Sequence, residues 1–136
     1  MIKESNDNEI EDLIINNRIV KHSVNGLSRL LILWIIKNNE NIHGYAIMKE
    51  LDKFFFNLIE EGVLKPSNSS KIYPILRNLE EHGTIIGQWH QQDNQRVKYY
   101  SLTGQGLEIF EYLLNKMEYI FKNDQWQLLL NDVKEQ

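Results

Sequence analysis

The side chains best suited to chemistry in this sequence are basic and hydroxyl groups gathered between Lys65 and Tyr100. This segment holds five lysine or arginine residues and three acidic ones, a local net charge of +2, whereas the 136-residue chain carries −4. Arginine and lysine bind phosphates and guanine edges, and serine and tyrosine hydroxyls add phosphate contacts. A locally basic segment on an acidic chain therefore predicts a surface that binds nucleic acid.

The residue types that support catalysis or metal binding are absent or badly spaced. The chain has no cysteine, which excludes thiol catalysis, disulfides and cysteine-ligated zinc. Its four histidines are scattered without the spacing of metal ligands. Glu60-Glu61 and Glu80-Glu81 are adjacent pairs, so their side chains diverge on a helix and cannot form an acid–base dyad. We therefore expect neither an enzyme nor a protein that carries a cofactor or a metal ion.

An amphipathic helix is predicted over residues 67–82. Apolar residues recur there at the helical spacing i, i+3, i+4, i+7, namely Ile72, Ile75, Leu76 and Leu79. The opposite face carries four candidate DNA-binding residues, Ser70, Lys71, Tyr73 and Arg77. The alternative interpretation is the ordinary solvated side of an amphipathic helix. Pro74 favours the functional interpretation, because a proline inside a helix costs up to ~3 kcal/mol and such violations tend to mark functional places.

Directly after this helix, a β-hairpin is predicted from strands at residues 84–91 and 97–102. Both runs are rich in β-branched and aromatic residues, and the loop between them is wholly polar. Arg96 and Lys98 stand beside the turn and are candidate phosphate contacts. We expect Tyr100 and Leu102 to pack inward, and Trp89 to pack on the strand face rather than to stack on a base. A helix followed by a basic hairpin is typical of a winged helix-turn-helix, which predicts a mainly α fold with a β-hairpin wing.

Further helices are predicted on both sides of this unit. A modest helix over residues 9–21 ends at Asn25-Gly26, and the next, over residues 27–37, is apolar nearly all round. Such a helix must be covered on every side, which suggests a partner subunit. A helix over residues 43–58 starts at His43 and carries an apolar stripe of Tyr45, Met48, Leu51 and Phe55.

The last two predicted helices follow the hairpin. Thr103 caps a helix over residues 104–122, and Asp124 caps a final helix with a Trp126 stripe. The expected organisation is an N-terminal extension over residues 1–24, a winged helix-turn-helix over 25–103 and a helical dimerisation region over 104–136. Trp34, Met117 and Trp126 are assigned either to an effector pocket or to the dimer core, and the dimer core is favoured because such stripes are usually packing.

Three motifs together resemble the PadR family of winged-helix transcriptional regulators. They are His43-Gly44-Tyr45, the run IYPILRNLEEHG over residues 72–83, and RVKYYSLTGQG over residues 96–106. The resemblance covers about residues 27–107. It implies a homodimeric repressor that binds a two-fold symmetric operator, with the C-terminal helices forming much of the dimer contact. It also implies Ser70, Lys71, Tyr73 and Arg77 on the recognition helix and Arg96 and Lys98 on the wing, and some relatives bind flat aromatic compounds.

The sequence thus predicts a cytoplasmic, sequence-specific DNA-binding transcriptional regulator. Its expected partners are double-stranded DNA, a second copy of the chain and an aromatic small-molecule effector. The longest apolar run, residues 30–36, is far shorter than the ~20 residues that span a membrane. The alternative is a winged-helix module that binds protein and not DNA; binding to promoter DNA that falls steeply with salt distinguishes the two.

Overall fold

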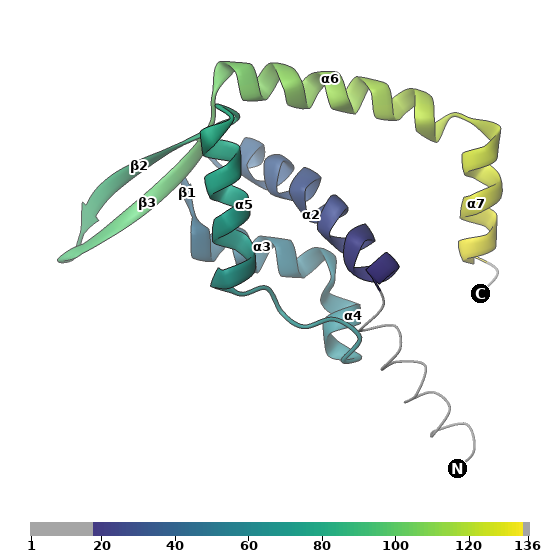
Figure 1. Ribbon diagram of the computed structural model, residues 1–136, viewed down its shortest axis with the longest axis horizontal. Helices are drawn as coiled ribbons and strands as arrows, with labels where there is room; N and C mark the ends of the chain where they lie inside the picture. The colour runs from purple at the N-terminus through teal and green to yellow at the C-terminus, as the bar shows by residue number, and fades with distance from the viewer. Residues whose placement is uncertain (1–17, 135–136) are drawn as a thin grey trace, which may run out of the picture.

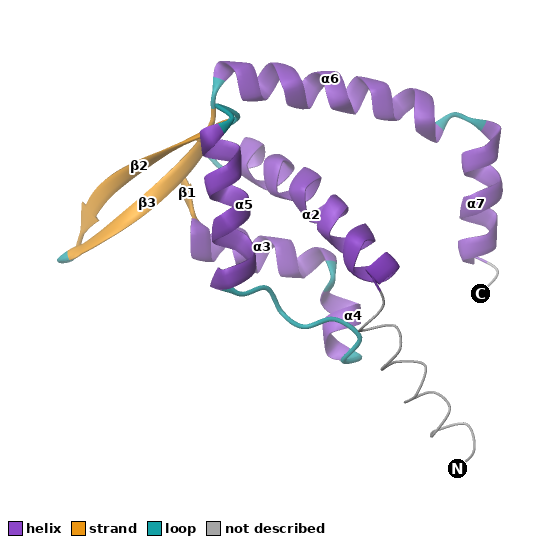
Figure 2. Ribbon diagram, in the orientation of Figure 1, coloured by secondary structure: helices purple, strands orange, loops and turns teal. Residues whose placement is uncertain are grey.

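The computed structural model describes residues 18–134, and the side chains from His22 onward. The described elements, in chain order, are α2 (Arg18–Asn38), β1 (Ile42–His43), α3 (Gly44–Phe54), α4 (Phe56–Glu60), α5 (Ser69–Glu81), β2 (Ile85–Gln92), β3 (Gln95–Leu102), α6 (Gly104–Phe121) and α7 (Asp124–Lys134). Helices α2, α3 and α5 form the body, the β2–β3 hairpin projects from it, and α6 crosses one end (Figure 1). Figure 2 shows how helix predominates over strand. The predicted helix over residues 9–21 lies largely outside the described residues.

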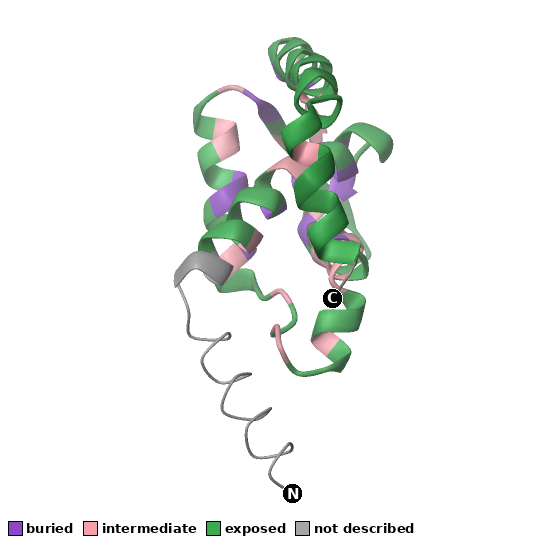
Figure 3. Ribbon diagram, turned by 90° about the vertical axis from the view of Figure 1, so that its right-hand side faces the viewer, coloured by how far each residue is buried: buried purple, intermediate pink, exposed green. Residues whose placement is uncertain are grey.

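The hydrophobic core lies where the three body helices meet the sheet and the start of α6. Its most deeply buried side chains come from every one of these elements, and they include Ile32, Ile35, Ile47, Leu51, Ile72, Leu76, Ile85 and Phe110. Figure 3 shows that the C-terminal helices are mostly exposed, and the buried residues of α6 are Gly106 and Phe110. The predicted buried face of α5 is confirmed for Ile72, Ile75 and Leu76, and Leu79 packs against its edge.

Helix α2 differs from the prediction, because it runs without a break through Asn25-Gly26. The Ser28 hydroxyl donates to the Val24 carbonyl at 2.7 Å and is itself buried. A glycine inside a helix costs about 1 kcal/mol, which the burial of the following turns outweighs. Helix α2 is also not covered on every side within one chain: Leu27 and Trp34 are 51% and 45% exposed. This leaves an apolar strip of α2 available to a partner.

Helix α3 begins as predicted but is shorter than predicted. The Ala46 N–H donates to His43 Nδ1 at 3.1 Å, so His43 caps the helix. The helix ends at Phe54, and α4 is a separate short helix after Phe55. Tyr45, expected on the buried stripe, is 57% exposed, and Ile47 is buried instead. The buried residues of α3 are Gly44, Ile47 and Leu51, so its buried face begins one residue before the predicted stripe. Gly44, in the first turn, faces Tyr73 of α5.

The sheet has three antiparallel strands in the order β1-β3-β2. In the hairpin Ile85 pairs with Leu102 and Trp89 with Lys98. Asp93 and Asn94 form the turn with φ of 46° and 66°, the left-handed conformation of a tight two-residue hairpin turn. Tyr100 is buried as predicted, and Leu102 packs against the core. Strand β1 was not predicted, because two residues are too few to show a strand period.

The hairpin leads into α6 through a joint at Thr103. Thr103 Oγ1 accepts from the Gly106 N–H at 2.9 Å, which confirms the predicted cap, and its hydroxyl donates to the Gly83 carbonyl at 2.6 Å. At the next helix start the cap is Asn123 and not Asp124: the Gln125 N–H donates to Asn123 Oδ1 at 2.9 Å, and Asp124 is already helical. Within residues 18–134 no helix combines the length and apolar character needed to cross a membrane.

Candidate nucleic-acid interface

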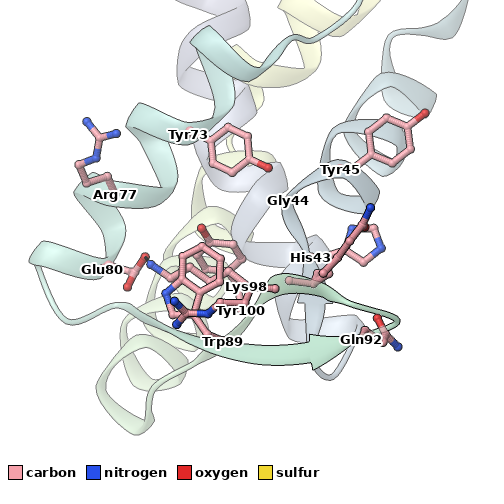
Figure 4. A pocket seen from close by; sticks show the side chains of 13 residues that line it. His43, Gly44, Tyr45, Tyr73, Arg77, Glu80, Trp89, Gln92, Lys98 and Tyr100 are labelled. Carbon is pink, nitrogen blue, oxygen red and sulfur yellow. Dashed lines mark hydrogen bonds and ion pairs between the residues drawn. The ribbon is translucent and has the colours of Figure 1, made fainter.

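A groove of about 700 Å³ runs between the start of α3, one face of α5 and the β2–β3 hairpin. Helix α5 contributes Tyr73, Arg77 and Glu80, which are spaced i, i+4, i+7 and so lie on one face. The hairpin contributes Arg96 and Lys98 among others. In Figure 4, Tyr73 and Glu80 come from α5, and Lys98 comes from the hairpin on the other side. Four of the six predicted DNA-binding residues therefore line one surface feature.

The α5 side of the groove is built on the cap at Asn68. The Lys71 N–H donates to Asn68 Oδ1 at 3.0 Å, so Asn68 caps the helix, which starts at Ser69. Ser70 is exposed in this first turn and Lys71 is half-buried, and neither lines the groove. Pro74 lies inside the helix as predicted.

Tyr73 contacts the start of α3, as its orientation toward Gly44 in Figure 4 shows. A Cβ atom on Gly44 would lie 2.7 Å from Tyr73 Oη and 2.9 Å from Cζ. A side chain there would push the ring aside, so Gly44 is the surface on which the tyrosine ring rests. This contact joins two of the three sequence motifs, which the sequence pattern does not reveal. Tyr73 as a whole is still 39% exposed.

Arg77, one turn further along α5, has no partner for its guanidinium. It is exposed and makes no hydrogen bond or ion pair with any residue of the described part of the chain. In Figure 4 the Arg77 side chain is directed away from Trp89 and Tyr100 of the hairpin. Its five N–H donors are therefore available to a base edge or a phosphate.

The wing side of the groove is organised by Trp89. The Arg96 guanidinium carbon lies 4.9 Å from the centroid of the Trp89 ring, within the range of a cation–π interaction. Trp89 lies on the sheet face as predicted, but it is 56% exposed and serves as a platform for cations rather than as core. Stacking restricts Arg96 while the donors at the edge of its guanidinium remain free, which suits it to a phosphate contact.

Lys98 is placed differently from the other cations. Its Nζ lies 2.7 Å from Glu80 Oε1, and the two side chains are only 25% and 27% exposed. A Cβ atom on Gly87 would overlap Lys98 Cε. The absence of a side chain at Gly87 therefore leaves room for the lysine side chain to extend over β2 toward Glu80. Burial raises the pKa of the neighbouring Tyr100 to about 12, and the Glu80 charge adds to this rise.

Trp34 and Trp126 belong to two separate aromatic contacts, and Met117 takes part in neither. Trp34 makes an edge-to-face contact with Phe54 of α3 at 5.7 Å. Trp126 contacts Phe121 at 5.3 Å across the turn between α6 and α7. Met117 is half-buried on α6. Within the described residues of one chain these clusters do not form a shared pocket among those found.

A helical body followed by a two-stranded β-hairpin defines a winged helix-turn-helix. The family model of the transcriptional regulator PadR-like family matches residues 32–111. This match covers more than half of the sequence, so the chain belongs to the PadR-like family of transcriptional regulators. The chain is thus a DNA-binding transcription regulator and not an enzyme. The predicted family and fold class are both confirmed.

Solved structures show the same fold. A protein from Streptococcus mutans UA159 is 29% identical, with a TM-score of 0.51, over 70% of this chain and 80% of that one. A PadR family transcriptional regulator from Eggerthella lenta is 23% identical, with a TM-score of 0.57, over 97% of this chain and 95% of that one. A PadR-like transcriptional regulator from Bacillus cereus is also 23% identical, with a TM-score of 0.58, over 82% and 94%. None of the curated proteins compared with this sequence matches it.

Proposed function

We propose that this protein is a repressor that binds a two-fold symmetric operator as a homodimer, with α5 in the major groove and the β2–β3 wing on the adjacent phosphates. The observation that carries the proposal is the pair of available guanidinium groups, Arg77 on α5 and Arg96 on the wing, on opposite sides of one groove. Arginine binds guanine edges and phosphates through two parallel hydrogen bonds. The Tyr73 hydroxyl adds a contact between them, and Ser70 and Lys71 at the start of α5 are the further candidates.

The proposed dimer contact consists of the apolar faces that one chain leaves uncovered. Every residue of α7 except Trp126 is exposed, and this helix includes Leu128, Leu129 and Val133. The exposed side chains of α2, Leu27 and Trp34, add to this surface. Exposed apolar patches of this extent mark interaction sites, and a second copy of the chain buries them symmetrically. Residues 104–136 are accordingly the proposed dimerisation region, and residues 25–103 the DNA-binding domain.

We further propose that an aromatic effector binds where Trp34 and Phe54 meet the dimer contact. The two rings stand edge to face and both are close to half exposed, so they offer an apolar wall to a flat molecule. An effector bound there would change the packing of α2 on the partner and therefore the separation of the two wings. The proposed compartment for this DNA-dependent activity is the cytoplasm.

The experiment that tests the function is footprinting on the DNA upstream of the protein's own gene, followed by gel shift with Arg77→Ala. A guanine contact contributes about 1–3 kcal/mol, so its loss from both subunits weakens operator binding by at least about 30-fold. Arg29→Ala is the matched control, because it removes an exposed guanidinium from α2, which contributes no residue to the groove. Arg77→Ala protein that shifts the promoter at wild-type concentrations would refute the assignment of α5. Promoter activity that rises when the gene is deleted supports repression, and activity that falls contradicts it.

A further inference from the structure

The ion pair between Lys98 and Glu80 is unlike the other two ion pairs among the described residues. Lys53–Glu50 and Lys122–Glu118 join neighbouring turns of a single helix and are largely exposed. Lys98–Glu80 joins the wing strand β3 to the last turn of α5, and about three quarters of each side chain is covered. Pairs at exposed helical positions are weak, whereas a partly covered pair is screened less by water and salt. Only this pair connects the wing to the recognition helix.

The surroundings of Lys98 hold its ammonium group in this position. Its Nζ lies 5.5 Å from the centroid of the Tyr100 ring and 5.6 Å from that of Trp89, so two aromatic faces flank the cation. The missing side chain at Gly87 opens the path toward Glu80. Arg96, two residues away on the same strand, has no acidic partner among the described residues. Of the two cations on the wing, one is neutralised within the protein and one is free.

We propose that Glu80 is a specificity-determining residue, which withholds Lys98 from the phosphate backbone so that the wing neutralises phosphate through Arg96 alone. The proposal rests on the proposed function of the groove as the DNA-binding surface. Binding to DNA of any sequence depends on how many phosphates the protein neutralises, whereas base contacts from α5 are made only at the operator. When one lysine per subunit does not neutralise a phosphate, the affinity for random DNA falls, whereas the base contacts made by α5 at the operator are kept. The ratio of operator to random affinity therefore rises.

The salt dependence of binding measures how many phosphates the protein neutralises, because each one contributes about 0.9 to the slope of log K against log salt. The experiment compares wild type, Glu80→Gln, Lys98→Met and the double variant on a random-sequence duplex by fluorescence anisotropy. Glu80→Gln releases Lys98, so we expect the slope to steepen by about 0.9 per subunit and the ratio of promoter to random affinity to fall. Methionine keeps the length of the lysine stem, so the double variant is expected to return to the wild-type slope.

The four proteins form a double-mutant cycle, which tests whether Glu80 keeps Lys98 from the phosphates. The effect of Lys98→Met on the slope is expected to be near zero when Glu80 is present and about 0.9 per subunit when Glu80 is replaced. A slope that falls by this amount when Lys98→Met is made alone would show that Lys98 already contacts phosphate. A steeper slope that persists in the double variant would assign the change to the lost carboxylate and overturn the proposal, as would no change in Glu80→Gln. Arg96→Gln, expected to lower the slope by about 0.9 per subunit, is the positive control for the wing.

The same measurement separates this proposal from the proposed function. Wild-type protein that binds neither duplex, or binds with no salt dependence, refutes DNA binding through the groove itself. Wild-type protein that binds promoter DNA, together with any of the contrary slopes above, refutes the role of Glu80 and leaves the DNA-binding function standing.

Discussion

Gly106 forms the joint between the DNA-binding unit and α6, and its replacement by alanine is expected to weaken that joint. A Cβ atom at this position would overlap the Thr84 carbonyl oxygen, which is backbone and has no rotamer to relieve the contact. Helix α6 must therefore move away from the turn between α5 and β2. That movement separates Thr103 from its acceptors, since the Thr103 N–H donates to Thr84 O at 3.2 Å and its hydroxyl to Gly83 O at 2.6 Å.

The size of the effect follows from these contacts. Two donors lose their acceptors at about 0.5–1.5 kcal/mol each, and forced overpacking adds about 1–3 kcal/mol. Alanine returns at most about 1 kcal/mol through its higher helix propensity. We therefore expect Gly106→Ala to lower the free energy of unfolding by about 1–5 kcal/mol, the balance of these terms.

Urea unfolding followed by tryptophan fluorescence at a fixed protein concentration measures this loss. With a slope of about 2 kcal/mol/M, the midpoint is expected to fall by roughly 0.5–2.5 M. Gly104→Ala is the matched control, because it makes the same substitution in the same first turn of α6, and a Cβ there meets no atom within 4 Å. Its stability should equal or slightly exceed that of wild type. Equal midpoints for the two variants would refute the argument that Gly106 is required for close approach.

Three further predictions concern the dimer, the core and the groove. Truncation after Lys122 removes α7, which carries Leu128, Leu129 and Val133 of the proposed dimer contact. Loss of these side chains is expected to cost about 2 kcal/mol or more of association free energy and so to raise the dimer dissociation constant at least about 30-fold; an unchanged dimer mass by light scattering at dilute concentration would contradict this. The raised pKa of Tyr100, about 12 against an ordinary 10, stabilises the fold fully below pH 10. Between pH 10 and 12 the tyrosine ionises first in the unfolded chain, so the free energy of unfolding is expected to fall by up to about 3 kcal/mol. Urea unfolding at pH 9 and 11.5 should show a smaller loss of stability in Tyr100→Phe than in wild type. Equal losses in both proteins would assign the change to other groups. Gly44→Ala pushes the Tyr73 ring off α3 and should weaken promoter binding at least about 100-fold in a gel shift, the equivalent of one charge-assisted hydrogen bond of about 1.5 kcal/mol in each subunit, with the unfolding midpoint preserved; undiminished affinity would show that the position of Tyr73 does not matter for DNA.

Local patterns predicted the parts of this protein whose structure depends on neighbours in sequence. The buried face of α5 follows from apolar residues one turn apart, and the caps at His43 and Thr103 follow from side chains that accept hydrogen bonds from the next turn. The hairpin was predicted from its alternation and its turn. Errors arose where tertiary packing overrode a local signal, as in α2, where burial on the body continues the helix through Gly26.

By itself, the sequence determined the class of protein: a helix and a basic hairpin in order, locally positive on an acidic chain, with the motifs of one family. Only the tertiary structure decided which of these basic residues is paired with a carboxylate. Arg77 and Arg96 have no acidic partner among the described residues, while Lys98 is neutralised by Glu80, a residue 18 positions earlier in the chain. The physical reason is that charge is counted along the sequence, but an ion pair is set by the distance between atoms. That distance depends on how β3 folds back beside α5.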